Sequence, residues 1–120
     1  MRPRRALFIA LASVTLAIAC GGGQPAPPPQ QQVDVVGIRS ELLAIGQAER
    51  QYLVAHGTYG TLDELQQERL LTGGANRRGY EFSAEVDAGQ GFTVTAVPSD
   101  PDKQHWPTLA IDQTMQVSER

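Results

Sequence analysis

The sequence has few of the features that support covalent cross-links, metal binding or catalysis. It contains one cysteine, Cys20, so no disulfide bond can form within a chain and the fold must depend on its apolar core. Its two histidines, His56 and His105, are not at metal-ligand spacing from any Cys, His or carboxylate, which argues against a zinc site. No nucleophile-elbow, phosphate-loop or zincin motif is present. The sequence therefore predicts a protein that is not an enzyme and binds no cofactor.

The chain also lacks an excess of basic residues and an apolar run of membrane-spanning length. It has 10 Lys and Arg against 13 Asp and Glu, and three of the basic residues precede Cys20, so residues 20–120 carry a net charge of −6. An acidic surface argues against nucleic acid and anionic lipid head groups as partners. The longest apolar run, residues 6–19, has 14 residues, whereas a spanning helix needs about 20.

The first 20 residues have the pattern of an export signal. Residues 1–5 are basic, residues 6–19 are apolar, and small residues precede Cys20. This pattern resembles the lipobox of bacterial lipoproteins, with Ala17 at the position where the lipobox prefers Leu. The resemblance implies removal of residues 1–19 and attachment of fatty acid to Cys20, which would anchor the protein to a membrane. An uncleaved anchor and a plain secretory signal remain as alternatives.

The residues after Cys20 predict a tether and then one folded domain. Residues 20–32 are rich in Gly, Pro and Gln, which is typical of a linker. Gly21, rather than Asp, follows the cysteine. In lipoproteins of Gram-negative bacteria this choice implies delivery to the outer membrane, here to its periplasmic face. Residues 33–120 are expected to form an α+β domain.

A long amphipathic helix is predicted over residues 33–55. Ile38, Leu42, Ile45 and Tyr52 recur at helical spacing and should face the core. We expect three further apolar residues to widen this face, and six polar residues to lie on the water-facing side. The first set is Val36, Leu43 and Leu53, and the second is Arg39, Glu41, Gln47, Glu49, Arg50 and Gln51.

The rest of the domain is predicted to be a short helix and an antiparallel sheet. Thr61 and Glu64 form a capping-box pattern before a helix over residues 62–68. Alternating apolar and polar residues predict strands over 80–86 and 92–97, and shorter strands follow at 108–112 and 115–117. Hairpin-linked strands form an antiparallel sheet, so the long helix should pack on one face of a meander of three or four strands.

This order of elements resembles the globular heads of type IV pilins and type II secretion pseudopilins. The residues that carry the resemblance are 48–52, 57–65, 79–82, 92–98 and 109–112. The resemblance implies a structural or accessory module that associates with pilus or secretion machinery. The chain departs from the family because it shows neither the prepilin leader nor the apolar half of the long helix. The sequence therefore predicts a tethered, monomeric head that does not polymerise.

The candidate ligand sites are weak. Asp100 and Asp102 offer oxygen ligands on one loop, and the major pseudopilin binds calcium in its C-terminal loops, but the ligand count is short and we expect no calcium site. Arg77 and Arg78 are expected in a solvated turn. The aromatic residues are expected in the core rather than in a ligand cage; they are Tyr52, Tyr59, Tyr80, Phe82 and Phe92. The alternative function is a periplasmic binding module that holds a peptide or small ligand on the sheet face or at the Trp106 loop.

Overall fold

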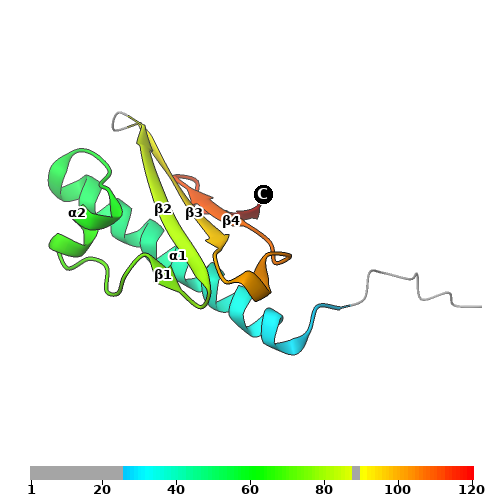
Figure 1. Cartoon of the computed structure of the whole chain (residues 1–120). Helices are drawn as coiled ribbons and strands as arrows, with labels where there is room; N and C mark the ends of the chain where they lie inside the picture. The colour runs from blue at the N-terminus through cyan, green and yellow to red at the C-terminus, as the bar shows by residue number, and fades with distance from the viewer. Residues whose placement is uncertain (1–25, 88–89) are drawn as a thin grey trace, which may run out of the picture.

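The computed structural model describes residues 26–87 and 90–120. The predicted signal peptide, Cys20 and the first part of the predicted linker lie outside these residues. A long helix lies across one face of an antiparallel sheet of five strands in the order β1-β2-β3-β4-β5 (Figure 1). The elements are α1 (Pro29–His56), α2 (Leu62–Gln67), β1 (Asn76–Arg77), β2 (Tyr80–Asp87), β3 (Gly91–Pro98), the 3-10 turn η1 (Pro101–Lys103), β4 (Leu109–Asp112) and β5 (Val117–Glu119).

The long helix α1 begins four residues before its predicted start and ends one residue after its predicted end. Pro29 is in the first turn of α1. The N–H groups of a first turn have no acceptor within the helix, so a proline there costs no hydrogen bond. At the other end Gly57 adopts the left-handed conformation, with φ 75°, and its N–H donates to the Leu53 carbonyl. A glycine is favoured at this position because a Cβ would be strained there. Among the described residues, no helix has both the length and the apolar character to cross a membrane.

The predicted inner face of α1 is confirmed, but the face is narrower than expected. Ile38 and Leu42 are completely buried and Ile45 nearly so. The expectation that Val36 and Leu43 would join them is wrong, because these side chains are 65% and 42% exposed. Each helical residue turns by about 100°, so neither side chain points in the direction of the core stripe. The sheet covers only that stripe.

The sheet contains one strand that was not predicted. β2 and β3 form a hairpin whose pairs run from Tyr80↔Pro98 to Asp87↔Gly91. β1 pairs with the start of β2, in a segment where the sequence predicted no strand, and raises the strand count to five. A strand of two residues is too short to show the alternation of apolar and polar side chains that predicts a strand from sequence. The last strand, β5, begins where the predicted one ended, because the turn that precedes it continues through Met115, whose φ is 65°.

The core lies between α1 and the inner face of the sheet. Gly46 allows a close approach here, since a Cβ at this position would lie 2.8 Å from the Met115 sulfur. The predicted packing of the helix against the strands is confirmed. The buried hydrophobic residues of the strands are Tyr80, Phe82, Phe92, Val94, Ala96, Leu109, Ala110 and Ile111.

Candidate functional site

The residues named as sites from the sequence do not gather in one place. Cys20 lies outside the described residues. The Asp100 carboxylate accepts a hydrogen bond from the Asp102 N–H, at 3.0 Å, and so caps η1. Within residues 26–87 and 90–120, no group of three or more His, Cys, Asp or Glu side chains could hold a metal ion.

We expect calcium to leave the stability of the protein unchanged, because Asp100 and Asp102 supply few ligands. A cation at a hundred times its dissociation constant would add about 2.7 kcal/mol to the free energy of unfolding. We expect thermal denaturation in millimolar calcium and in chelator to give the same midpoint. A rise of several degrees that Asp102→Ala abolishes would show that the loop binds calcium.

His56 and the aromatic residues have packing roles, whereas His105 does not. His56 stacks on Tyr52, with ring centres 4.1 Å apart, and its Nε2 lies 3.2 Å from Glu68 Oε1. His105 is exposed, and the neighbouring Trp106 lies under the Lys103 ammonium, which is 4.6 Å from the ring centre. The prediction of a core role for the five aromatic residues is confirmed, since four are buried and Tyr59 packs against Phe92.

An acidic junction joins α1, the following turn and α2. Glu49, which the sequence placed on the water-facing side, is completely buried. Its Oε2 accepts a hydrogen bond from the Gly60 N–H at 2.8 Å, and its Oε1 has no partner among the described residues. Burial raises the pKa of Glu49 to about 7, and the nearby Glu64 carboxylate adds to the rise. A signal for this burial was present, because Glu49 is seven residues after Leu42, almost two full helical turns.

Glu64 connects the two helices at the same junction. Its carboxylate and the Thr61 hydroxyl form the predicted capping box, which is confirmed. It also accepts a 2.5 Å hydrogen bond from the Tyr52 hydroxyl. This bond lowers the pKa of Glu64 and raises the pKa of Tyr52 to about 12. The junction thus stabilises the packing of α2 against the end of α1.

An ion network joins the first half of α1 to β1, to the turn that follows β1 and to η1. Asp34 is 6% exposed and lies 3.4 Å from Lys103 Nζ and 3.5 Å from Arg78 Nη1. The Gln30 amide also donates to Asp34, and together these groups lower its pKa. The prediction of a solvated turn is confirmed for Arg78, which is exposed in the turn between β1 and β2, and is wrong for Arg77, which is half-buried in β1. Both guanidinium groups also lie within 4.0 Å of Glu41 on α1. The network holds the first half of α1 against Arg77, Arg78 and Lys103.

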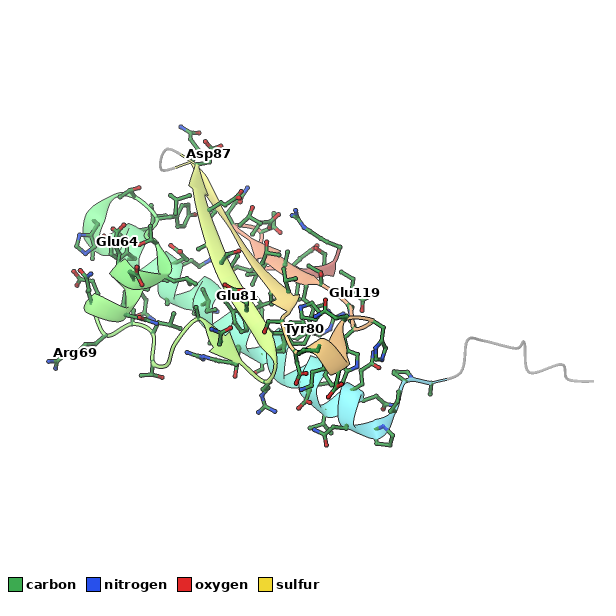
Figure 2. The ribbon with its side chains drawn as sticks, viewed as in Figure 1. Glu64, Arg69, Tyr80, Glu81, Asp87 and Glu119 are labelled. Atoms are coloured by element: carbon green, nitrogen blue, oxygen red, sulfur yellow. The ribbon has the colours of Figure 1, made fainter. Side chains whose placement is uncertain are left out.

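Two open hollows lie at opposite ends of the head. The first, of about 370 Å³, is at the end of the β2–β3 hairpin and is lined by Glu85, Asp87 and Asp112 among others. Figure 2 shows Asp87 at this end, far from Glu119. The second, of about 300 Å³, is at the start of α1. Its lining is mostly apolar and consists of Pro27, Gln31, Gln32, Val35, Val36, Pro107 and Glu119.

The comparisons with known proteins find similarity in structure. No protein-family model and no curated protein sequence matches the chain. The crystal structure of the Neisseria meningitidis non-core minor pilin PilV superposes with a TM-score of 0.56 at 18% identity, covering 75% of this chain and 86% of that one. A type IV pilin from Shewanella oneidensis gives a TM-score of 0.49 at 24% identity, covering 73% and 89%. The head of this protein therefore has the α+β fold of a type IV pilin.

Proposed function

We propose that this chain is a lipid-anchored cell-envelope protein whose pilin-like head is a non-catalytic structural or accessory module of a type IV pilus or type II secretion assembly. The observation that carries the proposal is the combination of a pilin-like fold with a Gly- and Pro-rich segment that follows Cys20. The head would face the periplasm from the outer membrane of a Gram-negative bacterium.

The charges on α1 support a tethered monomer rather than a filament subunit. Asp34 is engaged with Lys103 and Arg78, and Arg39 pairs with Glu119 of β5 at 3.0 Å. These contacts hold the first half of α1 against its own sheet. The outer side of this half of the helix presents polar groups to water. The net charge of −6 over residues 20–120 also adds repulsion between heads.

Lipidation is tested directly by changing Cys20 to serine. Metabolic labelling with a fatty-acid analogue should mark the wild-type protein and leave Cys20→Ser unmarked, because the chain has no other thiol. Wild-type protein should also fractionate with the outer membrane, and the variant should not. Equal labelling of the two proteins would contradict lipid attachment at Cys20.

A second function, the binding of a peptide or small ligand, is favoured by the hollow at the hairpin end. Its carboxylates Glu85, Asp87 and Asp112 would suit a cationic ligand. A short lysine-rich peptide that raised the melting temperature of the wild type but not of Glu85→Gln would favour this second function over the first.

A further inference from the structure

The start of α1 presents apolar side chains that the core does not use. Val33 is 60% exposed and Val36 is 65% exposed. They are three residues apart and so share one side of the helix. Val36 also lines the hollow with Pro27, Pro107 and Val35, of which Val35 is half-buried and packs partly against the core. We call these five residues the α1-start patch.

Two of the polar side chains beside the patch, those of Glu119 and Gln32, have partners. Glu119, the charged residue among those that line the hollow, is 3.0 Å from the Arg39 guanidinium. The Gln32 amide donates to the Pro27 carbonyl at 2.6 Å, so the described end of the tether is held along the first turn of α1. An apolar surface can therefore cover the patch without leaving its neighbouring charges unpaired.

We propose that the α1-start patch docks on the lipid bilayer in which Cys20 is anchored. The inference rests on the proposed function, because it requires the lipid on Cys20. The shortness of the tether favours the bilayer over other binding partners of the patch. Pro27, the first residue of the patch, is seven residues after Cys20, so this end of the patch is within about 25 Å of the anchored residue even at full chain extension.

The tether also makes weak docking effective. Contact between a patch and the membrane that carries its own anchor is an intramolecular event, with an effective concentration on the order of millimolar for a short linker. Two exposed valines and two prolines are then sufficient where they would not recruit a free protein. The acidic hairpin end lies away from the start of α1 (Figure 1), so docking through the patch turns Glu85 and Asp87 away from the lipid.

The docking is tested with two reporters on the lipidated full-length protein. The one natural tryptophan is removed by Trp106→Phe, and a new one is introduced as Val36→Trp in one protein and Val54→Trp in the other. Val54 is an exposed valine on α1, 88% exposed. It is 18 residues after Val36, which is five turns, so it shares the same side of the helix about 27 Å away.

Both proteins are reconstituted into phosphatidylcholine vesicles with brominated acyl chains. We expect fluorescence at position 36 to be quenched at least twofold more than at position 54. Adding Val33→Asp should reduce the quenching at position 36 toward the value at position 54, and high salt should not. Equal quenching at the two positions, or no effect of Val33→Asp, would overturn the docking.

Flotation of the same vesicles separates the two proposals. Protein that floats with the vesicles through Cys20 but shows equal quenching would refute docking and leave the lipid anchor intact. Protein that does not float would refute the lipid anchor, and docking with it. Circular dichroism of each variant in detergent confirms that it is folded.

Discussion

Replacing Leu42 with alanine should lower the free energy of unfolding by about 2–5 kcal/mol. Leu42 is completely buried between α1 and the sheet, so the change removes apolar contacts and leaves a cavity that the surrounding core fills only in part. The head has no disulfide to compensate, and a domain of this size is stable by about 5–15 kcal/mol. Urea or thermal denaturation of wild type and variant measures the loss.

Leu43→Ala is the matched control for this prediction. It makes the same chemical change one position along the same helix, at a side chain that is 42% exposed. We expect a loss of about 0.5 kcal/mol or less, as for surface substitutions in general. Equal losses for the two variants would contradict the packing of this face of α1 on the sheet.

Replacing Glu49 with glutamine should make the protein more stable than wild type at pH 8. Glu49 is completely buried, and its pKa is about 7 in place of the ordinary 4.5. This difference corresponds to about 3 kcal/mol, which is the upper limit of the gain. Glutamine retains an oxygen to accept the Gly60 N–H and carries no charge to bury. Denaturation curves at several pH values measure the effect.

The sign of the pH dependence follows from the raised pKa. Between pH 4.5 and pH 7 the folded protein holds a proton on Glu49 that the unfolded chain has released. Wild-type stability should therefore fall as the pH rises through this window and level off above it. Glu64, whose pKa is lowered by the Tyr52 hydroxyl, acts in the opposite direction and in more acidic solution. The difference between wild type and Glu49→Gln isolates the contribution of Glu49.

Glu81→Gln provides the control for charge removal. Glu81 is exposed on β2, as Figure 2 shows beside Tyr80. The same substitution there should reproduce the wild-type pH profile. A Glu49→Gln profile that kept the wild-type slope between pH 5 and pH 7 would mean that water reaches the Glu49 carboxylate.

Much of the fold could be predicted because it depends on local spacing. The stripe from Ile38 to Tyr52, the capping box at Thr61 and Glu64 and the alternation in β2 and β3 each involve residues close in sequence. Gly57 after His56 is likewise a local signal for the end of α1. The strand β1 could not be predicted, because two residues become a strand only when β2 supplies the partner.

The candidate site residues were harder to predict than the elements that hold them. Asp34 and Arg78 are 44 residues apart in sequence, and nothing in either segment indicates that they meet. Glu49 had the spacing of a core residue, but its charge pointed to the surface. We predicted an exposed side chain from the charge of Glu49, although its position on the helix correctly indicated burial.

By itself the sequence determined the α+β class, the long helix, the hairpin and the absence of an intramolecular disulfide. Those properties follow from periodicity, caps and composition, which act over a few residues. Only the tertiary structure decided which charges are buried and which apolar residues remain exposed. Glu49 is buried because the turn at Gly60 folds over it, and Val33 and Val36 are exposed because the sheet covers a single narrow stripe of α1. Burial depends on which surfaces meet, and contacts between distant segments set those surfaces.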